Sequence, residues 1–387
     1  MKCTFRKNKS HTIWLVAFWV VIFSPSFQAK SVPLGDQADQ QHKVLMVVSG
    51  YGENQGKDKP GYEFDELSKA YLTFRDNGVA VDIASPQGGA VEADEYDTKK
   101  SYNQTFLADQ KAVNKLADTL AFSAIDSSDY AAVFVVGGKG AMFDLPYDKT
   151  LQKIIASVYQ TGGSVGAVCH GPAALVDVKL NDGRYLVEGK KINGFTNVEE
   201  RMFGKKWVKH FDFLLEDKFN ERQARFQSSP MMLSHVAVDQ RLVTGQNPAS
   251  TVDTAQALLK SMGISPINSN QYSDDLTLKL VAEILNGNDQ AIQQYRDNKT
   301  RYEPMMMGMY GYMHFLSADS KHGYSQALTL MQLAQHDVNH DKLNLQIAKA
   351  HLKLGQVSQA KSLLWKITAS KPDSTEAHAL LEQLQKK

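Results

Sequence analysis

A short apolar run that ends abruptly in a cysteine constrains the fold more than any other stretch of this chain. Val165–Val168 has the composition of a buried strand, and Cys169, His170, Gly171 and Pro172 follow it at once. Proline is well tolerated at the first position of a helix, so a helix is expected to begin behind this turn. A reactive side chain on a strand-to-helix turn is exposed above the sheet edge and needs small neighbours. We therefore expect Cys169 to lie on a nucleophile elbow, where a helix N-terminus favours its thiolate.

Strands and helices alternate over roughly the first two thirds of the chain. This alternation is typical of an α/β fold with a parallel sheet that is covered by helices on both faces. The expected strands are 43–49, 79–84, 130–136, 165–168, 191–195 and 241–245, and helices are expected at about 62–76, 105–121, 149–161, 209–224 and 247–263. Sites in such sheets form at the carboxyl ends of strands, so the loops that begin at 50, 137 and 169 should converge.

A cysteine nucleophile needs a base, a group that orients the base, and donors for an oxyanion. His170 is adjacent to Cys169 and can lie beside the thiol. Gly137 and Gly138 follow a predicted parallel strand and offer backbone N–H groups to an oxyanion. The structural alternatives are a small cysteine buried in the sheet and a plain tight turn at the two glycines.

The N-terminus has the pattern of a signal peptide over residues 1–29. Four basic residues precede an apolar stretch from Ile13 to Phe23, which is short for a membrane span, and small residues follow it. Export to the periplasm or medium is the expectation, with an uncleaved membrane anchor as the alternative. Cys3 lies within this segment, so Cys169 would be the one cysteine of the mature protein and could form no intramolecular disulfide.

The pattern changes from mixed to helical beyond a linker at 264–273. Residues 43–263 form the predicted α/β domain, and 274–387 form an all-α domain of helical hairpins with turns at 286–288, 322–323 and 354–355. This domain resembles a tetratricopeptide repeat, because small, turn and proline residues fall near the positions of that repeat. The matching residues are Ala327, Ala348, Gly355, Ala360, Leu364 and Pro372.

Five stretches together resemble the ThiJ/PfpI superfamily, which has a class I glutamine-amidotransferase-like fold. The closest resemblance is to its glyoxalase III-like, heat-shock-chaperone-like branch, and it covers roughly residues 43–262. The stretches are the elbow Cys-His-Gly-Pro-Ala at 169–173, Gly-Gly-x-Gly-Ala-Met-Phe-Asp-Leu at 137–145, residues 74–89 with Ser-Pro-x-Gly-Gly, Gly-Lys-Lys-Ile-Asn-Gly-Phe-Thr-Asn-Val-Glu-Glu at 189–200, and Arg-Leu-Val-Thr-Gly-Gln-Asn-Pro-Ala-Ser at 241–250. The resemblance implies a flavodoxin-like sandwich.

The resemblance also implies roles for several acids. Glu200 would complete a triad with Cys169 and His170, and Glu66 on the first helix would contact the cysteine and act as an acid or base. The neighbouring Glu63 and Asp65 are interpreted as helix-surface charges. Lys139 stands where this branch usually has histidine, so a cation is expected beside the oxyanion loop and the substrate preference is open.

The implied activity is glutathione-independent conversion of α-oxoaldehydes such as methylglyoxal to hydroxy acids such as lactate, through a hemithioacetal on Cys169. No metal or redox cofactor is needed for it. The alternatives are a stress-related holding chaperone and a protein deglycase or peptidase. A glutamine amidotransferase is disfavoured, because none of the histidines begins a His-x-Glu motif.

The expected partners are a small aldehyde, a second copy of the chain in a homodimer, and a protein bound by the helical domain. The formal net charge of +1 gives no reason to expect nucleic acid. His336 and His340 have the spacing of metal ligands but lack a third ligand and the glutamate of a zinc protease. The methionines at 305–313 are interpreted as helix-pair core rather than as a binding groove.

Overall fold

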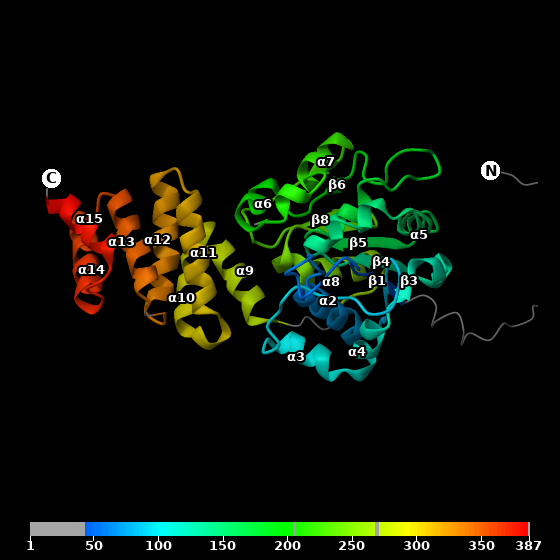
Figure 1. The fold of residues 1–387 in the computed structure, drawn as a ribbon, viewed down its shortest axis with the longest axis horizontal. Coiled ribbons are helices and arrows are strands. Elements are labelled where there is room, and N and C mark those ends of the chain that lie inside the picture. Colours follow the sequence, from blue (N-terminus) through cyan, green and yellow to red (C-terminus); the bar gives the residue numbers. More distant parts are fainter. Residues whose placement is uncertain (1–42, 205, 268–270, 339, 386–387) are drawn as a thin grey trace, which may run out of the picture.

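The computed structural model describes residues 43–204, 206–267, 271–338 and 340–385 (Figure 1). The predicted signal peptide, residues 1–29, lies outside the described residues. Over the described ranges, none of the helices combines the length and the apolar character that a membrane crossing requires.

A seven-stranded sheet forms the centre of the first domain, in the order β3-β2-β1-β4-β5-β9-β8. All neighbouring pairs are parallel except β8 and β9, which are antiparallel. The strands are β1 Lys43–Val47, β2 Ala80–Ser85, β3 Leu120–Ala121, β4 Ala132–Val135, β5 Ser164–Val168, β8 Val236–Asp239 and β9 Leu242–Gly245, and a separate pair is formed by β6 Lys191–Ile192 and β7 Arg225–Phe226. The predicted α/β class is confirmed, and the antiparallel edge strand β8 is an addition to it.

The order of the strands places helices on both faces of the sheet. Helix α2 (Phe64–Asp76) connects β1 to β2 toward one edge, and α5 (Lys149–Gln160) connects β4 to β5 toward the other. Because parallel crossovers are right-handed, connections that run in opposite directions lie on opposite faces. Helix α8 (Thr251–Ser261) packs against α2 and against β5 (Figure 1). The resulting sandwich brings the carboxyl ends of β1, β4 and β5 to one edge.

Two predicted helices are wrong in extent. The helix expected at 105–121 is two helices, α3 (Ser101–Ala108) and α4 (Gln110–Ala117), followed by β3. Asp109 causes the break, because its carboxylate accepts hydrogen bonds from the amides of Lys111 and Ala112 and so starts a new helix. The helix expected at 209–224 is limited to α7 (Leu215–Glu221).

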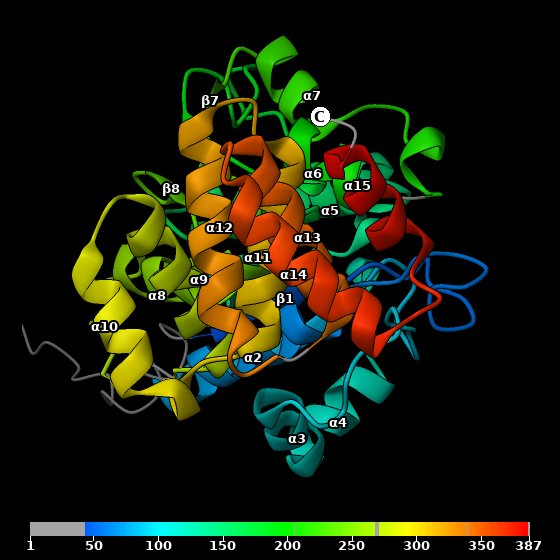
Figure 2. The same ribbon diagram turned by 90° about the vertical axis from the view of Figure 1, so that its left-hand side faces the viewer.

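The second domain is a row of seven helices within the described residues (Figures 1 and 2). They are α9 Ser273–Leu285, α10 Asp289–Asp297, α11 Pro304–Ser317, α12 Lys321–Gln335, α13 Asp341–Lys353, α14 Val357–Ser370 and α15 Thr375–Gln385. The turns predicted at 286–288 and 354–355 are confirmed. The turn predicted at 322–323 is wrong. Ser320 caps α12 by accepting a hydrogen bond from the amide of Gly323, so His322 and Gly323 lie in the first turn of the helix.

Small residues allow these helices to pack closely. Ala327, Ala348 and Ala360 are fully buried between neighbouring helices, as the repeat pattern predicts. The methionine stretch is core only in part: Met307 is buried, whereas Met305 and Met309 are more than half exposed. The exposed methionines line an apolar groove between α11 and α13, so the interpretation of the whole stretch as core is wrong.

Candidate active site

The elbow begins where the buried strand β5 ends. Cys169 has a positive φ of 59°, a left-handed conformation that a residue with a side chain rarely adopts. A single 3-10 turn, Gly171–Leu175, follows it in place of the predicted α-helix. The expectation that the N-terminus of an α-helix favours the Cys169 thiolate is therefore wrong. Burial and the charge of Glu66 instead raise the pKa of the Cys169 thiol well above its usual value.

Two glycines make room for this turn. A Cβ on Gly171 would lie 2.4 Å from the carbonyl oxygen of Val135, and a Cβ on Gly137 would lie 2.7 Å from the Cβ of Cys169. Neither position can accept a larger residue without a shift of the backbone. The small neighbours that a nucleophile elbow needs are present on the cysteine loop and on the loop that faces it.

His170 connects the thiol to a buried carboxylate. Its Nδ1 lies 3.4 Å from Sγ of Cys169, and its Nε2 lies 2.8 Å from Oε1 of Glu200. Glu200 is on α6 (Asn197–Phe203), which begins with a capping box formed by Thr196 and Glu199. All three side chains of this Cys-His-Glu row are nearly inaccessible to solvent. The fold therefore brings Cys169, His170 and Glu200 together, as predicted from the sequence.

Glu66 lies on the other side of the thiol. It is fully buried on α2, and its Oε2 accepts a hydrogen bond of 2.8 Å from the amide of Gly137. Burial and the charge of Glu63 raise the pKa of Glu66 well above its usual value. A Cβ on Gly137 would lie 2.6 Å from Oε2 of Glu66 and 2.7 Å from Cβ of Cys169, so the two side chains are neighbours and each acts on the pKa of the other. Oε1 of Glu66 has no hydrogen-bond partner among the described residues.

Glu63 and Asp65 are not surface charges, and this part of the sequence interpretation is wrong. Asp65 accepts hydrogen bonds from Lys100, Tyr102 and Asn103. Glu63 is half-buried, and burial together with the charges of Asp65 and Asp94 raises its pKa to about 7. Its charge also acts on Cys169. Glu63 is the residue directly before α2 and lies three positions before Glu66, so both side chains face the elbow, and this spacing is the signal in the sequence.

Two backbone amides near the thiol are free to bind an oxyanion. The amide of Gly137 is occupied by Glu66. The amides of Gly138 and His170 donate to no acceptor within the described part of the chain. One belongs to the residue after the nucleophile and the other to a facing loop, which is the usual arrangement at a nucleophile elbow. The amide of His170 was not among the residues predicted for this role.

Lys139 and a group of aromatic rings surround this site. Lys139 is half-buried, forms no hydrogen bond or ion pair within the described ranges, and lowers the pKa of the Cys169 thiol. The ring of His170 packs against Phe195 at 4.5 Å and Phe211 at 5.9 Å between centroids. No group of three or more His, Cys, Asp or Glu side chains in the described part of the chain could hold a metal ion.

A parallel sheet with a strained cysteine elbow, a Cys-His-Glu row and a facing buried glutamate defines a class of cysteine-site α/β proteins. The sequence profile of the DJ-1/PfpI family matches residues 59–261, and this chain belongs to that family. A tetratricopeptide repeat profile matches residues 323–384.

Relatives match the α/β domain over almost their whole length. The glutathione-independent glyoxalase hsp3101 of Schizosaccharomyces pombe is 33% identical over 240 residues, which are 56% of this chain and 95% of the relative. The glutathione-independent glyoxalase HSP31 of Saccharomyces cerevisiae is 35% identical over 227 residues, 55% of this chain and 94% of the relative. The crystal structure of glyoxalase III from Candida albicans superposes with a TM-score of 0.53 at 29% identity, covering 57% of this chain and 98% of that one.

Proposed function

We propose that this protein is a glutathione-independent glyoxalase that converts α-oxoaldehydes such as methylglyoxal to 2-hydroxy acids. The observation that carries the proposal is the position of Cys169, whose thiol lies between Glu66 and the His170–Glu200 pair. The names of the relatives at 33% and 35% identity support the same activity. Neither a metal nor a redox cofactor is part of the proposal.

The first step is addition of sulfur to the aldehyde carbon. Nδ1 of His170 takes the thiol proton, while the Nε2–H group donates to Glu200 and so keeps the ring in the required tautomer. A C–S bond forms, and the carbonyl oxygen becomes the oxyanion of a hemithioacetal. The amides of Gly138 and His170 are placed to bind this oxygen.

The second step moves hydrogen between the two carbons of the substrate. A base removes the proton from C1 of the hemithioacetal, and an acid delivers a proton to C2, so that C1 is oxidised while C2 is reduced. Glu66 suits this relay because it is buried beside the thiol and its raised pKa favours a carboxyl group that carries a proton between the two carbons. The product is a thioester of a 2-hydroxy acid.

Hydrolysis of the thioester completes the cycle. Water adds to the thioester carbonyl, the C–S bond breaks, and the sulfur leaves as a thiolate that takes back one proton. The net reaction is the addition of one water molecule to the α-oxoaldehyde. His170 is placed to take a proton from the attacking water, since it stands beside the sulfur.

The setting that accompanies this proposal is an exported protein that acts as a homodimer. Export is proposed from the charged and apolar pattern of residues 1–29, and contact with a partner protein is proposed for the helical domain. The mass of the mature N-terminus and cell fractionation test the first of these, and the mass in solution tests the dimer.

The decisive experiment is the consumption of methylglyoxal without glutathione by the mature protein and by Cys169→Ala. We expect lactate to form with the wild type and to fall to the uncatalysed background with the variant. Ser157→Ala on α5, whose hydroxyl bonds Ser127 before the start of β4 and so at the opposite edge of the sheet, serves as a control that should retain turnover. Absence of turnover by the folded wild type, or equal turnover by Cys169→Ala, would contradict the proposal.

A further inference from the structure

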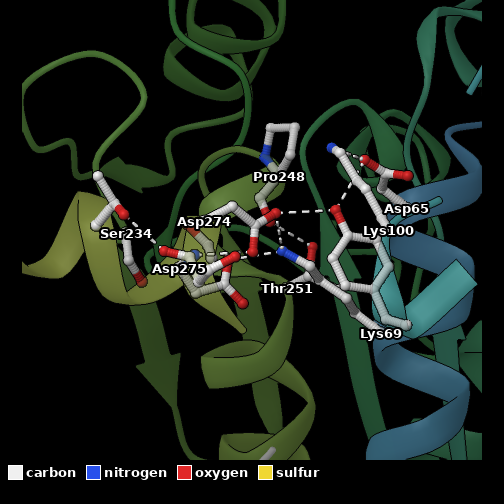
Figure 3. Close-up of polar contacts among 12 residues, drawn as sticks. Asp65, Lys69, Lys100, Ser234, Pro248, Thr251, Asp274 and Asp275 are labelled. Carbon is white, nitrogen blue, oxygen red and sulfur yellow. Dashed lines mark hydrogen bonds and ion pairs between the residues drawn. The ribbon is translucent and has the colours of Figure 1, made fainter. Parts of the chain in front are cut away.

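A buried ammonium group on the active-site helix has its counter-charges in the other domain. Lys69 of α2 is 3% exposed, and its Nζ donates hydrogen bonds of 2.9 Å to Asp274 and 2.7 Å to Asp275. Both aspartates lie in the first turn of α9, more than 200 residues away in sequence. Figure 3 shows Lys69 extending from α2 toward these two carboxylates. No carboxylate of the α/β domain pairs with Lys69 within the described residues.

The surroundings of Lys69 are built to hold a charge. The rings of Tyr102 and Tyr272 lie 4.6 and 5.5 Å from its Nζ, within the range of cation–π attraction. The hydroxyl of Tyr102 donates to Asp274 at 2.8 Å and to Asp65 at 3.1 Å. An unpaired ammonium in such a buried site would be strongly unfavourable. The α/β domain therefore depends on α9 to neutralise one of its own helices.

This network is adjacent to Glu66 in the helix. Lys69 is three residues after Glu66, and Asp65 is the residue directly before Glu66. Residues three apart lie on neighbouring parts of a helix surface, so a shift of Lys69 moves the backbone that carries Glu66. Thr73 also bonds the carbonyl oxygen of Lys69, which stiffens the same stretch of α2.

A second contact links the helical domain to the helix of Glu200. Leu233 of the α/β domain belongs to the apolar core of α9–α12, which includes Tyr310. Tyr310 lies near enough to Glu199 for that charge to raise its pKa, after the larger effect of burial. Oε1 of Glu199, the residue before Glu200, accepts hydrogen bonds from Met232, Gln246 and Asn247. The two helices that carry the active-site carboxylates, α2 and α6, thus both adjoin the helical domain.

We infer that Asp274 and Asp275 are positioning residues of the active site, which hold α2 through Lys69 and thereby keep Glu66 against Cys169. The helical domain is then a working part of the catalytic unit and not only an appended binding module. The inference rests on the proposed glyoxalase reaction for its kinetic test alone, since the contact between Glu66 and Cys169 can be tested without turnover.

The test compares Asp274→Asn with the wild type in the full-length protein. The first readout is the pH dependence of Cys169 alkylation by iodoacetamide. Glu66 raises the pKa of this thiol, so a displaced Glu66 should move the alkylation profile to lower pH. The second readout is methylglyoxal kinetics, where we expect kcat to fall about tenfold or more with a much smaller change in KM. A purely structural role would lower the melting temperature without moving the alkylation profile.

Lys279→Met is the matched control. Lys279 is also on α9 and pairs with Asp253 of α8 at 2.8 Å, but this pair is exposed and does not involve α2. We expect this variant to keep the wild-type alkylation profile and kcat. If Asp274→Asn does not fold, Asp275→Asn replaces it, because this change removes the 2.7 Å ion pair to Lys69 while Asp274 still compensates part of the ammonium charge.

The outcomes separate the two proposals. A shifted alkylation profile without any turnover in the wild type would support the positioning role and contradict the glyoxalase proposal. An unchanged profile and an unchanged kcat in a folded aspartate variant would overturn the positioning role, whatever the substrate. A shift of equal size in Lys279→Met would also overturn it, because the effect would then be general to the domain junction.

Discussion

At Cys169, charges of opposite sign act on the same sulfur atom. The charge of Glu63 raises the pKa of the thiol, whereas the ammonium of Lys139 lowers it. Both are smaller effects than burial and the contact with Glu66. Because Glu63 itself has a pKa raised to about 7, its influence on the thiol changes within the physiological pH range.

This balance predicts opposite effects of two substitutions. Removing the carboxylate in Glu63→Gln should move the pH profile of Cys169 alkylation to lower pH, and removing the cation in Lys139→Met should move it to higher pH. Rates of iodoacetamide labelling across a pH series measure both. Shifts in the same direction would contradict this account of the site. Glu53→Gln, which changes an exposed ion pair with Lys59, is the control that should leave the profile in place.

The residues of the elbow could be predicted because the signal is local. Small residues around Cys169 and glycines after a buried strand follow from the steric needs of a single turn, and the resemblance supplied Glu66 and Glu200. The partial burial of Glu63 could not be predicted, because burial of a charged residue at the start of a helix depends on which loops cover it. Those loops, at 51–61 and 137–140, come together only in the folded chain, where the amide of Gly140 bonds the carbonyl of Gly61.

At the scale of elements, α6 is a short helix with an important side chain. It has seven residues, too few for stability on its own, so its capping box carries much of its stability. Thr196 accepts a hydrogen bond from the amide of Glu199, and Glu199 accepts one from the amide of Thr196. The orientation of Glu200 toward His170 depends on this first turn.

Loss of the cap is therefore expected to affect both stability and activity. Thr196→Ala should lower the free energy of unfolding by about 1 kcal/mol and also reduce kcat for methylglyoxal. Asp148→Ala removes a comparable cap from α5, where Asp148 accepts from Thr150 and Leu151, and lies away from the thiol. It should cost a similar free energy in urea unfolding with kcat unchanged. Equal losses of kcat in the two variants would contradict a specific role of α6.

Elements with continuous apolar runs were predictable, and short amphipathic ones were not. β1, β4 and β5 are buried on both faces and so have unbroken apolar sequences. β8 lies at a sheet edge, pairs with β9 in the antiparallel direction, and has both buried and exposed residues. Its sequence therefore contains no continuous apolar run that would predict a strand. The break at Asp109 and the cap at Ser320 each depend on one side chain, which periodicity alone cannot distinguish from a surface residue.

At the scale of the whole molecule, the junction between the domains contains a titratable group. Burial raises the pKa of Asp275 to about 6, with Asp274 adding to the effect and Lys69 opposing it. The folded state therefore binds a proton on Asp275 more tightly than the unfolded chain does, whereas above about pH 6 the ionised carboxylate pairs with Lys69. Its contribution to stability is present below its ordinary pKa, near 4, and is lost as the pH rises through about 6.

This sign can be checked by comparing the wild type with Asp275→Asn. The free energy of unfolding of the wild type, relative to that of the variant, should decrease as the pH rises from about 4 to about 6 and stay level above that. Urea unfolding at several pH values in this window measures the difference, in which the contributions of groups that do not interact with Asp275 cancel. A difference that is constant or that increases with pH would contradict the burial of Asp275 at this junction.

The two-domain order was predictable from the change of sequence pattern, but the junction was not. Residues 273–275 have the acidic composition of an ordinary helix start. A lysine at position 69 is equally consistent with an exposed position on a helix. Only the folded chain brings them together across more than 200 residues. Contacts of this kind leave no periodicity in the sequence, since each partner is consistent with a solvent-exposed charge.

The ion pairs of Lys69 also have an evolutionary consequence. A lineage that lost the helical domain in one step would lose Tyr272, Asp274 and Asp275 together, and so would expose Lys69 and the buried ring of Tyr102 to water. A neutral replacement at position 69 would instead leave two buried aspartates without their cation while the helical domain is present. Either change alone lowers stability, so the fusion of the two domains resists reversal.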